Sequence, residues 1–186
     1  MLRLLTLLGQ RRNEVSGLPW AELDRKAGMW SLPAERAKND EANLVPLPDL
    51  AIAELDALAG GEKWPRRGFV FAARGGKTAV SGFSKAKRRI DALMAKAAAK
   101  EDAKVEPWVI HDLRRTLATN LQALGVDFAV TEHLLNHKEQ TRAGIAKVYQ
   151  RHGYKAEKRA ALALWEAELA RIVSDKPATV IPLRRA

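Results

Sequence analysis

The sequence contains no cysteine, few aromatic residues and no long apolar run. The absence of cysteine excludes disulfides and thiolate metal sites and is typical of a reducing compartment, so we expect a cytoplasmic protein. No apolar run approaches the roughly 18 residues of a transmembrane helix. The opening segment is short and interrupted by Arg3, unlike a signal peptide, so we predict no membrane association. Aromatic residues make up only 6% of the chain, which argues against a base-stacking surface for single strands.

Positive charge is in excess, because 32 lysines and arginines against 22 aspartates and glutamates leave a net charge of +10. The basic residues form short clusters at positions 11–12, 66–67, 85–89 and 114–115. Such clusters are typical of a domain whose partner carries many phosphates, although a soluble basic protein without that partner also fits the charge. We favour the backbone of double-stranded DNA as the partner. The predicted contacts to it are Arg12, Lys85, Lys87, Arg88 and Arg115.

The length of 186 residues suits one domain with a substantial core. Short strand-like segments predict a small three-stranded antiparallel sheet from residues 20–24, 29–33 and 43–47. Helical patterns cover residues 2–10, 49–58 (capped by Asp49), 81–100, 112–124, 128–136, 142–151 and 155–173. The predicted fold class is therefore mainly α with a small antiparallel sheet (α+β). We expect residues 1–173 to form this domain and the proline-containing tail 174–186 not to pack on it.

One polar pair lies at the start of a predicted helix. His111 and Arg114 are three residues apart in the segment IHDLRRTLATNL, so they project from one face of the helix. Leu117 and Leu121 follow the rhythm of a buried face. Taken alone, the pair is more often a surface ion-pair partner than a catalytic feature.

The pair gains meaning from the residues around it in the chain. Upstream, Arg11 is followed three residues later by Glu14, and Lys38 lies at the turn of the predicted hairpin ERAKNDEANLVPLP. Downstream, the segment LLNH ends in His137, and KVYQR carries Tyr149. An arginine with a following glutamate, a hairpin lysine, His-x-x-Arg, Leu-x-His and a tyrosine occur in this order in tyrosine recombinases.

The chain thus resembles the catalytic domain of tyrosine recombinases of the phage-integrase family, over most of residues 5–170. The resemblance to prophage integrases extends to a glutamine before the first arginine and to a basic stretch and a tryptophan after the tyrosine, here Gln10, Arg151 and Trp165. It implies the DNA breaking-rejoining fold and site-specific recombination through a 3′-phosphotyrosine. Members carry further amino-terminal DNA-binding domains, which we expect to be absent here, and self-associate on DNA, so we expect a tetramer of the full-length protein.

The resemblance also implies a role for each motif residue. Tyr149 is the nucleophile, and Arg11 and Arg114 hold the two non-bridging oxygens of the phosphate with paired, permanently charged donors that a lysine does not offer. His111 transfers a proton to or from the tyrosine oxygen.

Two further residues complete the implied site. His137 donates a hydrogen bond to the phosphate, and Lys38 protonates the departing 5′ oxygen. The alternative for Lys38 is an ordinary solvated turn lysine. No metal and no cofactor are implied, because arginines stabilise the charge that Mg²⁺ stabilises in other phosphoryl-transfer enzymes.

Other interpretations of these residues are weaker. His133 and His137 have the spacing of a helical zinc pair, but the glutamate of the zincin motif is missing between them. Tyr154 is a rival nucleophile, yet it follows Gly153 and lies beyond the helix expected to carry Tyr149. Glu14 is interpreted as structural, against a backbone amide or an arginine.

Two alternatives for the whole chain stay open. The first is a DNA-binding module that descends from an integrase and lacks turnover. The second is a type IB topoisomerase, which shares the chemistry in a different sequence context. The presence of all the catalytic residue types favours the recombinase.

Overall fold

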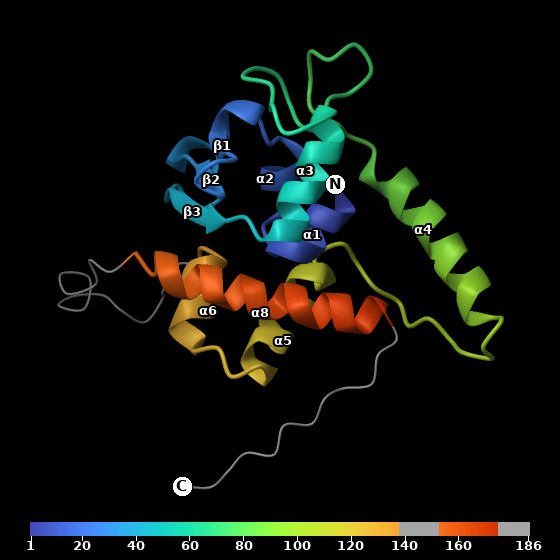
Figure 1. The fold of residues 1–186 in the computed structure, drawn as a ribbon. Helices are drawn as coiled ribbons and strands as arrows, with labels where there is room; N and C mark the ends of the chain where they lie inside the picture. The colour runs from blue at the N-terminus through green and yellow to red at the C-terminus, as the bar shows by residue number, and fades with distance from the viewer. Residues whose placement is uncertain (138–152, 175–186) are drawn as a thin grey trace, which may run out of the picture.

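The computed structural model describes residues 1–137 and 153–174. The fold is mainly helical with one small antiparallel sheet, as predicted, and the sheet lies to one side of α1, α2 and α3 (Figure 1). In the view of Figure 1, α8 crosses the front of the molecule, with the sheet, α1, α2 and α3 above it and α5 and α6 below it. The elements are α1 (Leu2–Leu8), α2 (Arg12–Ser16), η1 (Trp20–Glu22), β1 (Leu23–Asp24), β2 (Met29–Leu32), η2 (Ala34–Arg36), β3 (Asn43–Pro46), α3 (Asp49–Ala59), α4 (Phe83–Ala98), α5 (Asp112–Ala123), α6 (Phe128–Leu134) and α8 (Lys155–Val173).

The sheet has the order β1-β2-β3, and Trp30 of β2 pairs with Val45 of β3. Both residues are fully buried, which makes this pair the anchor of the sheet on the core. The prediction of a strand over residues 20–24 is wrong for its first three residues. They form a 3₁₀ turn that buries Trp20, and its carbonyl accepts the Leu23 amide, so β1 is only two residues long.

Helix α3 begins as predicted, but its start is not capped as predicted. Pro48 occupies the N-cap position, and Asp49 is the first helical residue without a side-chain capping bond. Its carboxylate still lies in the first turn, where a negative charge is favourable beside the positive end of the helix dipole. The two later helices α6 and α8 confirm the predicted segments, α6 ending two residues early. The predicted helix 142–151 and most of the tail lie outside the described residues.

The core is built on α1, whose leucines at positions 4, 5, 7 and 8 are all buried between α3, α5 and α8. Trp165 of α8 is 1% exposed, and its Nε1 donates to the Thr6 carbonyl at 2.8 Å. Lys158 of α8 is buried as well, and its Nζ donates to Asn43 Oδ1 at 2.8 Å. Burial lowers the pKa of Lys158 to about 8.

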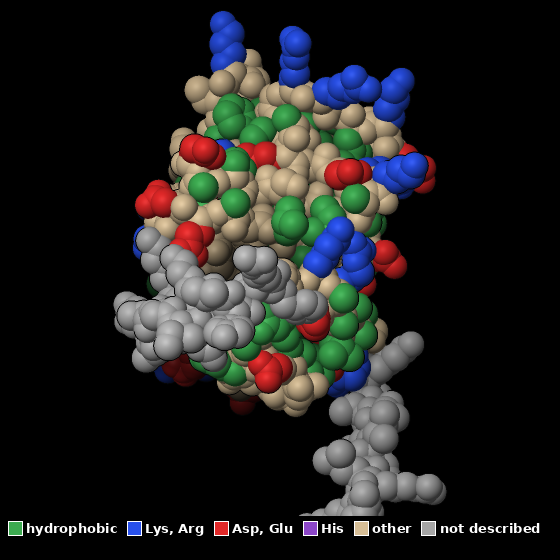
Figure 2. Space-filling view, turned by 90° about the vertical axis from the view of Figure 1, so that its left-hand side faces the viewer, with side chains coloured by type: hydrophobic (Ala, Val, Ile, Leu, Met, Phe, Trp, Pro, Cys, Tyr) green, Lys and Arg blue, Asp and Glu red, His purple; other side chains and the backbone are tan. Residues whose placement is uncertain are grey.

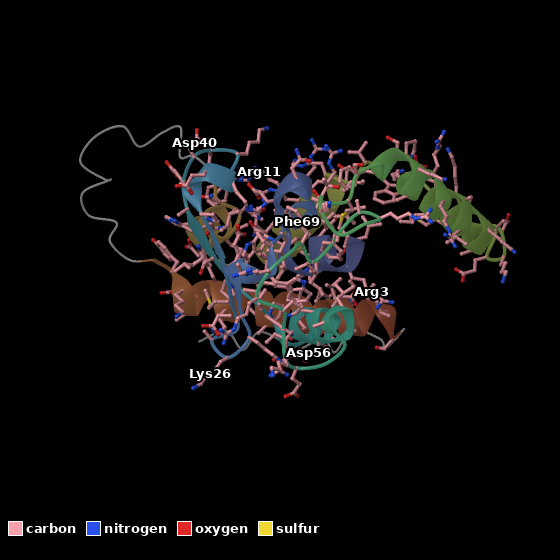
Figure 3. The ribbon with its side chains drawn as sticks, turned by 90° about the horizontal axis from the view of Figure 1, so that it is seen from above. Arg3, Arg11, Lys26, Asp40, Asp56 and Phe69 are labelled. Carbon is pink, nitrogen blue, oxygen red and sulfur yellow. The ribbon has the colours of Figure 1, made fainter. Side chains whose placement is uncertain are left out.

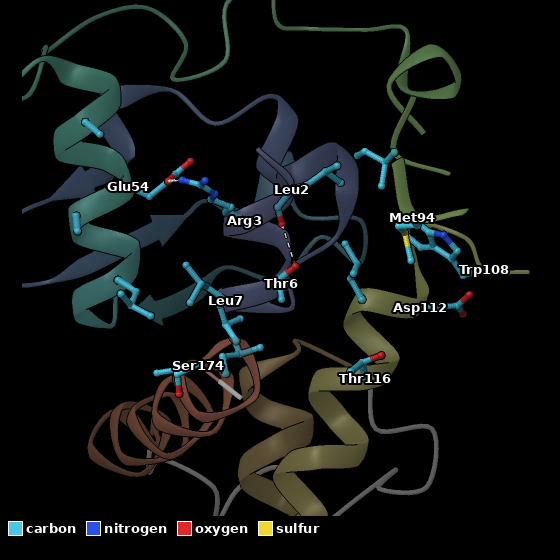
Figure 4. A pocket seen from close by; sticks show the side chains of 18 residues that line it. Leu2, Arg3, Thr6, Leu7, Glu54, Met94, Trp108, Asp112, Thr116 and Ser174 are labelled. Atoms are coloured by element: carbon cyan, nitrogen blue, oxygen red, sulfur yellow. Dashed lines mark hydrogen bonds and ion pairs between the residues drawn. The ribbon is translucent and has the colours of Figure 1, made fainter. Parts of the chain in front are cut away.

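Helix α4 projects from the body of the molecule (Figure 1), and none of its residues is buried. Its residues Ile90 and Met94 line an apolar groove with a volume of about 1060 Å³, which the start of α1 and the end of α8 also line. The ion pair between Arg3 and Glu54, at 3.0 Å, lies on another wall of the groove (Figure 4). The described catalytic candidates Arg11, Lys38, His111, Arg114 and His137 do not line this groove. Within the described parts of the chain, no helix is long and apolar enough to cross a membrane.

Candidate active site

The end of α6 is the point at which side chains from distant segments meet. The last carbonyls of a helix have no partner within the helix. Beyond α6, Asn136 takes a left-handed conformation with φ of +52°, which asparagine tolerates better than most residues. The carbonyls of Leu134, Leu135 and Asn136 then accept hydrogen bonds from side chains elsewhere in the chain. Three consecutive carbonyls therefore organise the polar groups beside His137.

Arg114 reaches this point from the first turn of α5 and is only 4% exposed. Its Nη2 donates to the Leu135 carbonyl, and its Nη1 donates to the Gly9 carbonyl at 2.9 Å. Gly9 has a φ of +62°, and a Cβ atom there would lie 2.9 Å from Leu117 Cδ1, so glycine allows α1 to end this close to α5. Burial and the nearby Arg11 lower the pKa of Arg114 to about 10. Arg114 is therefore still a cation at neutral pH.

Arg11 approaches the same helix end from the start of α2. Its Nη2 donates to the Asn136 carbonyl at 3.1 Å, and its Nη1 forms an ion pair with Glu14 Oε1 at 3.1 Å. Glu14 is 2% exposed and also accepts the Arg11 backbone amide at 3.0 Å. Glu14 is interpreted from the sequence as structural, against a backbone amide or an arginine, and it contacts both the amide and the guanidinium of Arg11. Glu14 orients the guanidinium of Arg11 toward the end of α6.

Lys38 lies in the connection between β2 and β3, as predicted, and its side chain is exposed. Its backbone amide donates to Glu14 Oε1 at 3.3 Å, so one carboxylate contacts both Arg11 and the segment that carries Lys38. In Figure 3, Arg11 and Asp40 of this connection lie on the same side of the molecule. The structure thus brings the Lys38 segment to the arginine pair, although no side-chain contact of Lys38 with Arg11 or Arg114 is formed.

The two predicted site histidines differ in their surroundings. His111 occupies the N-cap position of α5, and partial burial, followed by the charges of Arg114 and Arg115, lowers its pKa below the usual 6.5. A neutral imidazole at pH 7 has a nitrogen free to accept a proton. His137 lies directly beyond the turn at the end of α6, where its Nδ1 lies 2.8 Å from Glu132 Oε1. The predicted nucleophile Tyr149 lies outside the described residues.

His133 and Tyr154 are the residues of the two alternative interpretations, a zinc pair of His133 with His137 and a second candidate nucleophile. The two rings stack on each other, with centroids 4.4 Å apart, and Tyr154 packs against the hydrophobic core at the start of α8. His137 instead contacts Glu132. Among residues 1–137 and 153–174, no group of three or more potential ligands lies close enough together to hold a metal ion.

The predicted DNA contacts lie on α2, α4 and α5. Arg12 of α2 lies over the ring of Phe83, 4.8 Å from its centroid, and Arg115 of α5 is exposed while pairing with Asp112 at 2.7 Å. The other three residues are on the projecting helix α4, where Lys85 and Arg88 are exposed and Lys87 is paired with Asp91. Figure 2 shows the side of the molecule that lies on the left in Figure 1. Lysine and arginine side chains project from the top of this side, and acidic side chains lie across its middle.

The hydrogen bonds of the buried polar residues around this site were not predicted from the sequence, in which only Gln10 was named among them, as part of the resemblance. Gln10 Nε2 and Asn43 Nδ2 both donate to the Leu134 carbonyl, at 3.0 and 3.1 Å. Asn39 Nδ2 donates to the Asn136 carbonyl at 2.9 Å. The available signal was positional, because Asn39 directly follows Lys38 and Asn136 directly precedes His137. Asparagine is common in surface turns, so this signal is weak without the tertiary contacts.

Residues 1–155 match the model of the phage integrase family. The chain belongs to this family. It is 30% identical over 168 residues to the prophage integrase IntA of Escherichia coli (strain K12), covering 89% of this chain and 36% of that protein. It is 31% identical over 130 residues to the integrase of Salmonella phage P22, covering 68% of this chain and 32% of that integrase. This member of the family spans about a third of the length of these relatives.

Two solved structures share the fold of this chain. The integrase from mycobacterium phage Brujita matches with a TM-score of 0.59 and 16% identity, over 88% of this chain and 50% of that one. The XerA recombinase matches with a TM-score of 0.55 and 16% identity, over 94% of this chain and 55% of that one. The prediction of a tyrosine recombinase catalytic fold is confirmed.

Proposed function

We propose that this chain is the catalytic domain of a site-specific tyrosine recombinase, which cleaves and rejoins duplex DNA through a 3′-phosphotyrosine. The observation that supports this most directly is the convergence of Arg11 and Arg114. Their guanidinium groups donate to the adjacent carbonyls of Asn136 and Leu135, beside His137. Two permanently charged forks at one point suit a phosphodiester with two non-bridging oxygens.

In the proposed chemistry, each site residue either transfers a proton or stabilises a charge, apart from the nucleophile itself. The Tyr149 oxygen attacks phosphorus, and neutral His111 accepts its proton. The bond from phosphorus to the 5′ oxygen breaks, and Lys38 gives this oxygen its proton. Arg11, Arg114 and His137 stabilise the negative charge that develops on the non-bridging oxygens, since donors held in place by the protein need little reorganisation during the reaction.

The proposed organisation places this chemistry in residues 1–173, with residues 174–186 as a carboxy-terminal tail. Because the chain spans about a third of its relatives, recombination by the whole protein is proposed to involve further DNA-binding parts and a tetramer on attachment-site DNA. Neither a cofactor nor a metal ion has a role in these steps.

Binding to duplex DNA is expected to weaken steeply with salt, because the proposed contacts join lysine and arginine to phosphates. Replacing Arg88 on α4 by glutamine should reduce the slope of log affinity against log salt by about 1. Lys26, on the side of the molecule opposite Arg11 in Figure 3, is the matched control, and Lys26→Gln should leave the slope unchanged. Fluorescence anisotropy at several salt concentrations measures both. An equal effect of the two variants would argue against α4 as a DNA-contacting element.

The proposed function is tested by incubating the chain with a nicked duplex whose cleavage releases a short strand that diffuses away. We expect a covalent protein–DNA adduct on a denaturing gel, because loss of the released strand prevents rejoining. The test uses duplexes that carry candidate attachment sites, with a duplex lacking the scissile-strand nick as control. Binding without any adduct would instead indicate a DNA-binding module that lacks turnover.

A further inference from the structure

Two buried asparagines link the segment of Lys38 to the segment of His137. Asn39 is 8% exposed and Asn136 is 9% exposed. Asn39 Nδ2 donates to the Asn136 carbonyl at 2.9 Å, and Asn136 Nδ2 donates to Asn39 Oδ1 at 3.1 Å. Asn136 Nδ2 also donates to the Glu41 carbonyl at 2.8 Å. We call this reciprocal pair, Asn39 and Asn136, the asparagine clasp.

The clasp and Arg11 share a hydrogen-bond acceptor. The Asn136 carbonyl accepts both Asn39 Nδ2 and Arg11 Nη2, and the neighbouring Leu135 carbonyl accepts Arg114. On the other side, Asn39 directly follows Lys38, whose amide donates to Glu14. The clasp thus connects the segment of the exposed Lys38 to the half-buried Arg11 and, through the neighbouring carbonyl, to the buried Arg114.

We propose that the asparagine clasp is a positioning device for Lys38 that sets where its ammonium group lies relative to the phosphate held by Arg11 and Arg114. This rests on the proposed function. An exposed lysine side chain is long and flexible, so its backbone must be held if its proton is to reach one particular oxygen. The segment around Lys38 connects β2 to β3 and is not itself part of a strand. The clasp and Glu14 hydrogen-bond this segment to the rest of the domain.

The structure offers a substitution that removes the clasp without straining the backbone. Asn136 has a φ of +52°, a conformation that glycine adopts freely, so Asn136→Gly removes only the side chain and keeps the carbonyl that binds Arg11. Asn39→Ala removes the other half of the clasp. Asn120→Ala is the matched control, because among the described residues the Asn120 side-chain amide bonds within its own helix, to the Thr116 carbonyl at 2.8 Å.

The decisive measurement is the rate of adduct formation on two nicked duplexes that differ at the leaving atom. In one, the 5′ bridging atom is oxygen, which needs a proton from Lys38; in the other it is sulfur, which departs as a thiolate without one. Both clasp variants should cleave the oxygen substrate about 10- to 100-fold more slowly, the effect of a misplacement of about 1 Å. They should cleave the sulfur substrate close to the wild-type rate, as Lys38→Ala should. Asn39→Ala added to Lys38→Ala should cause no further loss.

A second readout does not depend on cleavage. Hydrogen exchange of the Lys38 and Asp40 amides, which donate to Glu14 Oε1 and to the Ala37 carbonyl, should become faster in Asn136→Gly and Asn39→Ala. Exchange in α1 and α5 should stay unchanged in these variants, and Asn120→Ala should resemble the wild type throughout.

Three results would contradict the proposed role of the clasp in positioning Lys38. They are equal slowing of both substrates, full activity of both variants, and unchanged exchange at Lys38 and Asp40. A wild-type chain that forms no adduct with either substrate would be a failure of the proposed function instead. In that case the exchange data alone decide whether Asn39 and Asn136 hold this segment.

Discussion

Replacing Tyr149 by phenylalanine should abolish the covalent protein–DNA adduct while leaving the affinity for duplex DNA close to that of the wild type. The substitution removes a single oxygen, the atom proposed to bond to phosphorus, and no other hydroxyl is assigned that role. Binding should persist, because the proposed affinity comes from lysine and arginine contacts to the phosphate backbone. Adduct formation on the nicked duplex and anisotropy titration with the same DNA measure the two effects separately.

Tyr154→Phe is the matched control, since it makes the same change in the other tyrosine of the chain. Tyr154 is the N-cap residue of α8, with a φ of +46°, and its ring stacks on His133. These contacts give it a place in the packing of the domain, so its phenylalanine variant should still form the adduct. Loss of adduct in Tyr154→Phe with survival in Tyr149→Phe would exchange the two assignments. Adduct in both variants would contradict a tyrosine recombinase that works as proposed.

Arg114→Lys should lower the rate of cleavage by at least about 100-fold, the scale on which removal of one preorganised donor acts. Lysine keeps the charge but loses the planar fork, so it cannot hold the phosphate while contacting both the Gly9 and Leu135 carbonyls as Arg114 does. Arg11→Lys should behave in the same way, because Arg11 contacts both Glu14 and Asn136. Contacts that strengthen in the transition state affect the rate more than affinity, so DNA binding should change little.

Arg3→Lys is the control for these variants, since Arg3 of α1 is exposed, forms an ion pair with Glu54 at 3.0 Å and is not one of the predicted DNA contacts. It should cleave at nearly the wild-type rate. Thermal unfolding must accompany the kinetics, because Arg114→Lys leaves a buried carbonyl without its donor, a loss of about 1–3 kcal/mol in the free energy of unfolding. Equal losses of binding and cleavage would make Arg11 and Arg114 simple anchors of the DNA backbone.

Local patterns in the sequence predicted most elements of the fold. The apolar spacing of α8 predicted its bounds from Lys155 to Val173, and the turn residues around the hairpin placed Lys38 between β2 and β3. The failures were also local. Residues 20–22 have strand-like composition, but burying Trp20 favours a 3₁₀ turn, and Pro48 takes the capping position expected for Asp49. In both places a packing contact or a proline overrode the preference of single residues.

The polar network at the end of α6 was beyond the reach of such patterns. Gln10, Asn39 and Arg114 lie far from Leu134, Leu135 and Asn136 along the chain, yet they donate to the carbonyls of these residues. No periodicity links such residues, because their contact follows from how α1, α5, α6 and the hairpin pack together. For Glu14 the sequence predicted a backbone amide or an arginine as partner, but not that its carboxylate contacts both the Arg11 guanidinium and the Lys38 amide.

The sequence by itself determined the identity and order of the motif residues, the positive charge of the chain and the helical pattern of most of its length. These are properties of residue type and of spacing along one chain. Only the tertiary structure decided that Arg114 is buried, that Arg11 and Arg114 meet at one helix end, and that Asn39 and Asn136 join the lysine to them. The physical reason is that a helix end leaves its last carbonyls without partners, and which side chains satisfy them depends on where the folded chain brings its donors.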